Sequence, residues 1–337
     1  ADVEFQRRRT WFECVDLVHA ALPAFSAEDA AIETDFLGRP LAAPFIIGAM
    51  TGGTDEAAAV NRALARVAAR CGVGLALGSQ RPMLQFPSLE AGYRLRDVAP
   101  GILILGNIGL SQALALKPAE VAALADRIGA DGICLHLNAA MEMFQTGGDR
   151  PRAGAQAALG RLARELGDRL IVKETGCGIS RETAALLARL GVRTVDVAGA
   201  GGTSWVRVEN LRRGGAAPGL EAFEEWGIPT AASLAEIRGL RLRVIASGGL
   251  RSGLDLAKSI ALGASIGSAA LPVLRALARG GEEAAVEWIH GLVAGLRSAM
   301  VLAGGRDLKS LRRVPLVITG PLRDWLEQRC LWRPPRA

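Results

Sequence analysis

The chain has 337 residues, of which 50% are hydrophobic and 22% are charged, and its formal net charge is +6. This balance excludes a disordered chain, and the length suits one large α/β barrel. Nucleic-acid binding is disfavoured because the arginines are scattered and only 4% of the residues are aromatic. A solvated Arg-rich surface or a site for an anionic ligand accounts for the positive charge.

Cysteine content and hydropathy indicate where the protein works. The five cysteines include no pair with CxxC spacing, which excludes a disulfide framework and favours a reducing compartment. No apolar run reaches about 18 residues, and the first residues do not resemble a signal peptide. We therefore expect a cytoplasmic protein without a membrane span. The mean hydropathy of +0.24 is high, so we expect apolar surface between subunits or in an apolar pocket.

Residues 1–40 precede the first buried strand, and we expect them to form an N-terminal helix and a hairpin-like arm. Beyond this arm, short apolar runs alternate with longer segments of helical period. The predicted strands are Pro44–Ala49, Val73–Leu77, Ile102–Leu105, Gly132–Leu137, Leu170–Lys173, Thr194–Val197, Arg243–Ala246 and Ser265–Ala269. The predicted helices are Glu56–Arg70, Pro118–Ile128, Gly154–Leu166, Arg181–Leu190, Ser233–Arg238 and Gly253–Leu262, with Thr54, Ser180 and Ser252 among their N-caps.

Strands that are apolar on both faces and alternate with helices form a parallel sheet. Eight such repeats favour a single (β/α)₈ TIM barrel domain, residues 1–337, over an open doubly wound sheet. The open sheet would place a GxGxxG motif at its first strand, whereas the glycine cluster at residues 199–202 follows the sixth. Residues 206–228 are expected to form a flexible insertion. Residues 291–337 are expected to form a C-terminal helical extension, with the apolar run 314–320 between subunits.

The loops that follow the strands of such a barrel carry its active site. Gly248 and Gly249 follow the seventh predicted strand, and Ala269 and Ala270 lie at the end of the eighth. Small residues let backbone N–H groups approach a phosphate, and a helix N-terminus favours its negative charge. These loops therefore predict a phosphate-bearing cofactor, although glycines that only make tight turns would give the same pattern.

Lys173 ends the fifth predicted strand, where a buried cation needs a partner. Glu174 is adjacent, but neighbouring residues of a strand point to opposite faces. The anionic edge of a flavin ring would serve as the partner, and Thr51, Ser79 and Asn107 would hydrogen-bond the same ring. A Schiff base on this lysine, as in an aldolase, is the alternative.

His136 and Asn138 end the fourth predicted strand and are two residues apart, so both side chains face the same side. The remaining histidines, His19 and His290, lie in helical segments and are predicted to be structural. Glu142 follows on the same loop. A lone carboxylate near a phosphate pocket suits Mg²⁺, although a solvated loop glutamate is the alternative.

Distinctive segments occur in order along nearly the whole chain. They include Met50-Thr51-Gly52-Gly53-Thr54, Gly78-Ser79-Gln80-Arg81, Leu135-His136-Leu137-Asn138, Gly199-Ala200-Gly201-Gly202-Thr203-Ser204-Trp205, Trp226-Gly227-Ile228-Pro229-Thr230 and Ser247-Gly248-Gly249-Leu250-Arg251. In these segments the chain resembles the type 2 isopentenyl diphosphate isomerases. The resemblance implies an FMN-dependent (β/α)₈ barrel that forms a homotetramer or an octamer. It also implies a proton shift between isopentenyl and dimethylallyl diphosphate, supported by Mg²⁺ and by FMN that NADPH has reduced, without net redox change.

The resemblance implies roles for individual residues. Those of the FMN site would be Ala49, Met50, Thr51, Ser79, Asn107, Lys173, Thr203, Gly248, Gly249, Ala269 and Ala270. Those near the substrate diphosphate would be Arg8, Arg9, Arg81, His136, Asn138 and Met141. Glu142 would be the Mg²⁺ ligand, and the catalytic residues would be His136, Lys173 and Glu142.

Three positions depart from the family's pattern. Phe12 replaces a histidine of the N-terminal motif, Met141 replaces a glutamine, and Leu271 stands where the loop after strand eight has an arginine. The first two changes leave open a diverged enzyme that isomerises or cyclises a longer prenyl or carotenoid substrate, with Trp11 and Phe12 as an apolar wall. A redox flavoenzyme and a non-catalytic flavin-binding protein are further alternatives.

Overall fold

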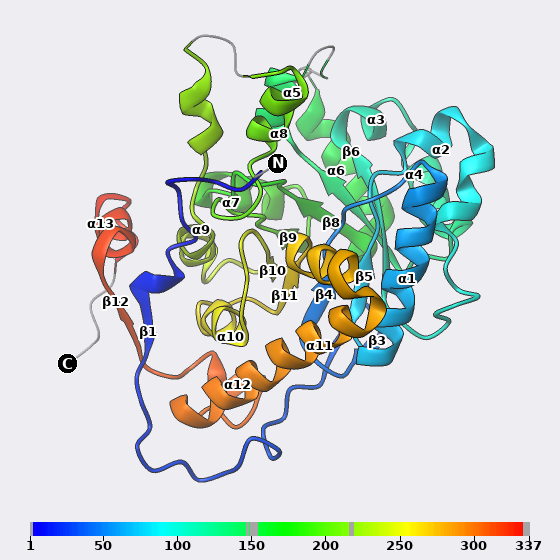
Figure 1. Cartoon of the computed structure of the whole chain (residues 1–337). Helices are drawn as coiled ribbons and strands as arrows, with labels where there is room; N and C mark the ends of the chain where they lie inside the picture. The colour runs from blue at the N-terminus through cyan, green and yellow to red at the C-terminus, as the bar shows by residue number, and fades with distance from the viewer. Residues whose placement is uncertain (1–2, 146–147, 149–153, 216–218, 333–337) are drawn as a thin grey trace.

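The computed structural model describes residues 3–145, 148, 154–215 and 219–332. Its centre is a closed barrel of eight parallel strands, which confirms the predicted (β/α)₈ fold (Figure 1). The strands are β4 (Phe45–Ile47), β5 (Gly74–Ala76), β6 (Ile104–Gly109), β7 (Gly132–His136), β8 (Leu170–Lys173), β9 (Thr194–Asp196), β10 (Arg243–Ala246) and β11 (Ile266–Ala269). β11 pairs with β4 and closes the barrel, and each strand overlaps one of the predicted runs.

Alternate residues of these strands point into the barrel and pack as a core of their own. Ile46, Leu105, Ile171 and Ile245 belong to this inner cluster, whereas residues such as Ile47 and Val172 pack outward against the helices. A short antiparallel hairpin, β2 (Thr34–Phe36) with β3 (Arg39–Leu41), adds Phe36 and Leu41 to the inner cluster. Since the strand interiors are filled in this way, open space remains only toward the strand ends.

Helices alternate with the strands, and every predicted helix overlaps one of them. They are α1 (Asp55–Cys71), α4 (Pro118–Arg127), α6 (Ala155–Leu166), α7 (Arg181–Arg189), α9 (Thr230–Ile237) and α10 (Gly253–Ala261). Thr54, Ser180 and Ser252 cap α1, α7 and α10 by accepting a backbone N–H, as predicted. Shorter helices lie between or after these elements: α2 (Arg81–Gln85), η2 (Pro87–Tyr93), α3 (Leu110–Leu114), α5 (Ala139–Phe144), η3 (Gly167–Arg169) and α12 (Leu308–Leu311).

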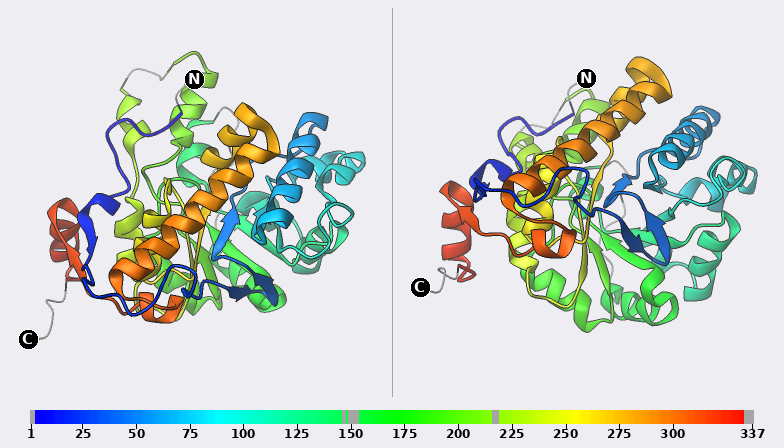
Figure 2. Two further views of the ribbon diagram at one scale, coloured as in Figure 1. Left: turned by 60° about the horizontal axis from the view of Figure 1, so that its bottom comes forward. Right: turned by 90° about the horizontal axis from the view of Figure 1, so that it is seen from below.

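The last barrel helix, α11 (Leu271–Ala303), bends where Gly280 and Gly281 leave helical geometry. By length and composition alone, it is the one helix in the described part of the chain that could cross a membrane. Its longer half packs along the barrel against α10 and α1, and Glu282 and Glu283 form ion pairs with Arg66 and Arg70 of α1 (Figure 2). These contacts show that α11 packs against the other helices of the barrel. Its first half, residues 271–279, is the short extra helix that often follows strand eight at a phosphate site.

The N-terminal arm differs from the prediction, because its described part contains no N-terminal α-helix. The only helical turn there is η1 (Phe12–Cys14), which leads into β1 (Val15–Leu17). β1 pairs antiparallel with β12 (Leu316–Ile318) of the C-terminal extension. The apolar run 314–320 therefore has a strand partner within its own chain. The helix α13 (Gly320–Gln328) follows and packs against η1 and α9.

The segment 206–228, expected to be a flexible insertion, contains regular structure. α8 (Trp205–Arg212) opens it, and the 3₁₀ helix η4 (Glu221–Glu225) lies near its end. Three hydrogen bonds tie the two together, since Ser204, Arg207 and Asn210 all donate to Glu224. Residues 216–218 of the expected insertion, and residues 333–337 of the extension, lie outside the described residues.

Candidate active site

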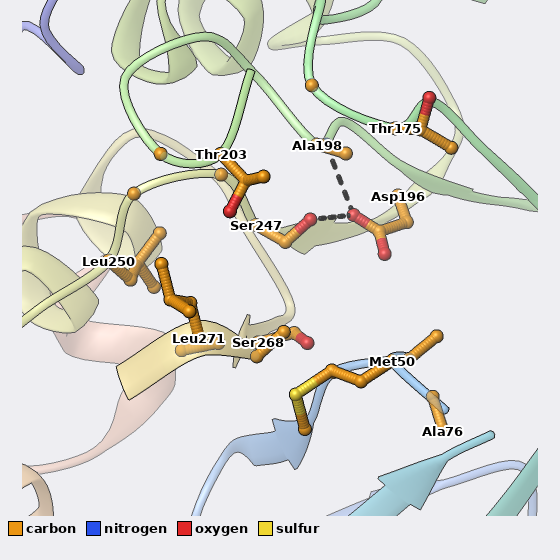
Figure 3. A pocket seen from close by; sticks show the side chains of 18 of the residues that line it. Met50, Ala76, Thr175, Asp196, Ala198, Thr203, Ser247, Leu250, Ser268 and Leu271 are labelled. Carbon is orange, nitrogen blue, oxygen red and sulfur yellow. Dashed lines mark hydrogen bonds between the residues drawn. The ribbon is translucent and has the colours of Figure 1, made fainter. Parts of the chain in front are cut away.

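A cavity of about 370 Å³ opens at the carboxyl ends of the strands. Its volume lies in the range of small-molecule and cofactor sites. Nine of the residues predicted for a cofactor line it: Ala49, Met50, Thr51, Lys173, Thr203, Gly248, Gly249, Ala269 and Ala270. The lining also includes Thr175, Asp196, Ser247 and Ser268, which the sequence analysis did not select (Figure 3). The structure thus brings together residues from loops that are far apart in the sequence.

Lys173 lies on the cavity wall, and its Nζ donates to the backbone oxygen of Glu174 at 2.6 Å. The carboxylate of Glu174 turns away, as expected for a strand neighbour, and accepts backbone N–H groups of its own loop. In the barrel, Lys173 is directly opposite Asp196 of β9. Asp196 therefore joins Glu174 as a buried carboxylate that interacts electrostatically with this cation.

Asp196 is held from two sides. Ser247 Oγ and the backbone N–H of Ala198 both donate to its Oδ1, as Figure 3 shows. Burial raises the pKa of Asp196, and the charge of Lys173 and these two hydrogen bonds oppose the rise. The cavity therefore contains a coupled cation and acid, which is an arrangement typical of functional sites.

His136 and Asn107 form a hydrogen-bonded pair behind the cavity. His136 Nδ1 lies 2.8 Å from Asn107 Oδ1, and Asn107 Nδ2 donates to the backbone oxygen of Leu77 at 3.0 Å. This second bond assigns the carbonyl oxygen of Asn107 to the histidine, so Nδ1 carries the proton and Nε2 is the acceptor. Neither residue is part of the cavity lining, and neither is Ser79. Their predicted contacts with a flavin ring therefore stay predictions.

His136 is expected to be neutral from about pH 5 upward, because burial, aided by the charge of Lys173, lowers its pKa to about 4. In an unfolded chain the same ring takes up a proton below about pH 6.5. Acid therefore favours unfolding. As the pH falls from about 6.5 to 4, protonation of His136 in the unfolded chain should lower the free energy of unfolding by about 1.4 kcal/mol per pH unit. Urea unfolding of the protein and of His136→Gln between these pH values measures the difference. An imidazole that titrates near pH 6.5 by NMR would contradict this expectation.

A second small cavity adjoins the first, and Thr175, Gly176 and Trp205 line both. Asn138 and Met141 also line it. Asn138 has left-handed backbone geometry with φ of 47°, so that its side chain reaches back over α5. Its amide group donates to Met141 Sδ at 3.2 Å and to Glu142 Oε1 at 3.4 Å, and its Oδ1 accepts from Thr175 at 2.7 Å.

Asn138 offers an oxygen atom at the second cavity, and Glu142 lies beside Asn138. Hard oxygen donors of this kind suit Mg²⁺, which usually takes one or two carboxylates together with substrate phosphate oxygens. No group of three or more His, Cys, Asp or Glu side chains within the described residues is arranged to hold a metal ion. The residues fit a magnesium ion that a phosphate-bearing ligand helps to bind, and they do not form a complete protein cage.

The loops after β10 and β11 fit a phosphate group. Gly248 and Gly249 have left-handed φ values of 96° and 80°, and a Cβ atom there would collide with the backbone of Gly199 and Gly201. Glycine is thus required for the loops after β9 and β10 to pack together. The helix α11 begins directly behind Ala270 without a capping side chain. Its first N–H groups therefore point toward this end of the cavity with no side-chain acceptor, as a phosphate site requires.

Residues 3–10, which we call the N-terminal strap, cross the loop after β9. The backbone N–H of Phe5 donates to Gly202, that of Ser204 donates to Val3, and Val3 lines the cavity. Glu4 forms ion pairs with Arg251 and Arg275, which follow the two phosphate loops. Although burial opposes it, these arginines hold the pKa of Glu4 below its usual value. The strap is thus fixed to the rim of the cavity.

The arginines predicted to bind a diphosphate are not part of the lining of either cavity. Arg8 and Arg9 belong to the strap, and Arg81 is exposed at the start of α2. The expected apolar wall of Trp11 and Phe12 is not formed. Phe12 is only 2% exposed and lies in the core, and Trp11 packs edge-on against Trp325 of α13 with ring centroids 5.8 Å apart. Both residues anchor the arm to the C-terminal extension.

Comparison with known proteins identifies the fold and the family of the chain. Residues 89–317 match the FMN-dependent dehydrogenase family. Solved structures of mandelate oxidase share the fold: a mutant with the monooxide FMN adduct has a TM-score of 0.64 and 22% identity, covering 92% of this chain and 90% of that one. The complex with (S)-2-phenylpropionate also has a TM-score of 0.64 and 22% identity, covering 92% and 88%.

Curated relatives are more similar in sequence. The isopentenyl-diphosphate delta-isomerase of Methanothermobacter thermautotrophicus is 44% identical over 330 residues, which cover 97% of this chain and 92% of the relative. The enzyme of the same name from Methanosarcina mazei is 42% identical, covering 97% and 91%, and that of Pyrococcus abyssi is 42% identical, covering 94% and 89%. On this similarity, the chain belongs to the type 2, FMN-dependent isopentenyl-diphosphate delta-isomerase family.

Proposed function

We propose that this protein interconverts isopentenyl and dimethylallyl diphosphate with bound FMN. The reaction moves one double bond: a proton is added to the terminal methylene carbon and another is removed from C2. Atoms and electrons balance without an oxidant. The observation that carries the proposal is Lys173, a cation at a strand end on the cavity wall and opposite the buried acid Asp196, in a chain of this family.

FMN fits the residues present. The N-terminus of α11, which has no capping side chain, and the glycines after β10 suit its phosphate. Lys173 suits an anionic edge of its ring. When bound as the reduced form, with NADPH as the reductant, it would supply a group that exchanges a proton with the substrate alkene. Lys173, fixed by the backbone oxygen of Glu174, would hold positive charge beside the reacting groups. The side chains of the cavity's alanines offer water no hydrogen bonds, which would limit its attack on a cation formed from the alkene.

The chain's own residues also account for diphosphate binding. Arg8, Arg9 and Arg81 would contact its oxygens, with neutral His136 and Asn138 as hydrogen-bonding partners. Glu142 would hold Mg²⁺, which would supply positive charge to offset that of the diphosphate.

The free state of all five cysteines supports a cytoplasmic location, and the slightly positive mean hydropathy supports a homotetramer or octamer.

The direct test is incubation of the protein with FMN, NADPH, Mg²⁺ and isopentenyl diphosphate under anaerobic conditions. Dimethylallyl diphosphate is the expected product, and its formation should cease when Mg²⁺ is chelated. Incubation in deuterated water should place deuterium in the product, because the added proton comes from exchangeable groups. Protein that retains FMN yet forms no dimethylallyl diphosphate would sink the proposed substrate while leaving the cofactor assignment standing.

A further inference from the structure

The carboxylate of Glu225, at the end of η4, accepts three consecutive backbone N–H groups of the N-terminal strap. Gln6 donates to Oε1 at 2.9 Å, and Arg7 and Arg8 donate to Oε2 at 3.1 and 2.6 Å. Arg8 Nε also donates to the backbone oxygen of Glu225 at 3.3 Å. Successive N–H groups that converge in this way form the concave anion site called a nest. Here the anion comes from the chain itself.

This arrangement does little for the hydrophobic core. Gln6 and Arg7 are exposed and Arg8 is only half-buried, so the three bonds cover no apolar surface of note. They instead fix the backbone conformation of residues 6–8. Burial raises the pKa of Glu225, but the three N–H groups and the charge of Arg7 outweigh it and lower the pKa overall. The carboxylate is therefore ionised at neutral pH and its bonds are charge-assisted.

Glu225 is itself held firmly by the loop after β9. Its neighbour Glu224 accepts side-chain hydrogen bonds from Asn210 and Arg207 of α8, and its backbone oxygen accepts from Ser204. Ser204 follows the cavity residue Thr203 directly. The strap is thus attached through Glu225 to the same loop that forms part of the cavity wall.

The strap continues from the nest to the cavity rim. A Cβ atom on Gly201 would meet the backbone of Arg9 and Thr10, and one on Gly249 would meet the Thr10 side chain at 2.5 Å. The backbone oxygen of Thr10 accepts from Ala231 at 2.9 Å. Two glycines without side chains therefore seat residues 9–10 against the loops of the cavity. Arg8 thus belongs to the nest and Arg9 to the seat, so the backbone of both arginines is held.

We propose that Glu225 is a positioning residue for the substrate: by fixing the backbone of residues 6–8, it presents Arg8 and Arg9 to the diphosphate. This inference rests on the proposed function, in which these two arginines contact the diphosphate. Glu225 lines neither cavity, and its negative charge would repel a diphosphate rather than bind it. Its contribution is to reduce the conformational freedom that the strap loses when a diphosphate binds.

The test compares Glu225→Gln with the matched control Glu221→Gln, which removes an exposed carboxylate from the other end of η4. Gln keeps the shape of the side chain but offers an uncharged oxygen and an N–H₂ group that repels backbone donors. In the FMN- and Mg²⁺-loaded enzyme, KM for isopentenyl diphosphate should rise about tenfold. The inhibition constant of inorganic diphosphate should rise by the same factor. kcat and the affinity for FMN should change by less than about twofold.

A double-mutant cycle separates positioning from a merely structural role. In an Arg9→Ala or Arg8→Ala background, Glu225→Gln should weaken inorganic diphosphate binding much less than in the wild-type background, because the group that it positions is gone. Glu225→Asp keeps the charge with a shorter reach and should restore part of the affinity. If Glu225→Gln does not fold, the same cycle with Glu225→Asp decides the question.

Two results would overturn the inference. One is an unchanged inhibition constant of inorganic diphosphate in Glu225→Gln. The other is a loss that is fully additive with Arg8→Ala and with Arg9→Ala. Failure of the proposed function has a different signature, namely a wild-type enzyme that neither forms dimethylallyl diphosphate nor binds inorganic diphosphate.

Discussion

Replacing Lys173 by methionine should lower kcat/KM for isopentenyl diphosphate by a factor of about 10² to 10³, the usual loss when a preorganised electrostatic group is removed from a water-excluded site. Methionine matches the length of the lysine stem, so the cavity keeps its shape while the cation at the end of β8 is lost; Arg212 and Arg251, which also line the cavity, remain. Asp196, opposite Lys173 in the barrel, then has no neighbouring cation, and its raised pKa should rise further. Steady-state kinetics with reduced FMN measure the effect.

Flavin absorbance and the Lys173→Arg variant provide the controls. Because Lys173 is the cation predicted at the ring edge, Lys173→Met should shift the spectrum of the bound reduced flavin, whereas a variant that acts only through folding should not. Arg keeps the charge but is bulkier and spreads it over a plane, so it should recover only part of the activity. A Lys173→Met enzyme within about threefold of wild type in kcat/KM would remove this lysine from the proposed mechanism.

Glu174→Ala should lower the free energy of unfolding by about 3 to 5 kcal/mol, since one buried and two partly buried donors lose their acceptor at about 1 to 3 kcal/mol each. Glu174 is 7% exposed, and its Oε2 accepts backbone N–H groups from Thr175 at 2.7 Å, Gly176 at 2.8 Å and Cys177 at 2.5 Å. Alanine removes the one acceptor that these three donors share. Urea unfolding of the FMN-free and FMN-loaded protein measures the loss.

Glu174→Gln is the matched comparison. Burial raises the pKa of Glu174 despite these hydrogen bonds, so the protonated acid is less unfavourable here than in water, and glutamine is its neutral counterpart. Glutamine keeps one acceptor oxygen, so Glu174→Gln should lower the free energy of unfolding clearly less than Glu174→Ala does. An alanine variant within about 1 kcal/mol of wild type would mean that water replaces the carboxylate and that the loop does not depend on Glu174.

The strands could be predicted from sequence because a barrel buries both faces of every strand. Runs such as Leu170–Lys173 are therefore continuously apolar and end in a polar residue. The pairing of β1 with β12 could not be predicted, because three-residue strands carry no period and their partners lie at opposite ends of the chain. The prediction of an N-terminal helix was wrong for a related reason: residues 12–14 make only one helical turn before the chain enters β1 of that sheet.

The candidate site was predictable where the loop composition carries the signal. Glycine and alanine at the strand ends correctly indicated one cavity. Asp196 was missed although a signal existed, since an acid inside the otherwise apolar run Thr194–Val197 is unusual. The ion pairs of Glu4 with Arg251 and Arg275, and the nest on Glu225, join residues more than two hundred positions apart. Only the folded chain brings these charges together.

The sheet of β1 and β12 sets the order in which the enzyme can be assembled during synthesis. The ribosome releases β1 before, and β12 after, all eight barrel strands, so β1 gains its strand partner late. A nascent chain can close its barrel and still have an undocked arm. Anchoring of the arm that leads to the strap is thereby coupled to the synthesis of β12. Chains that end before β12 should consequently be poor catalysts even when their barrels are folded.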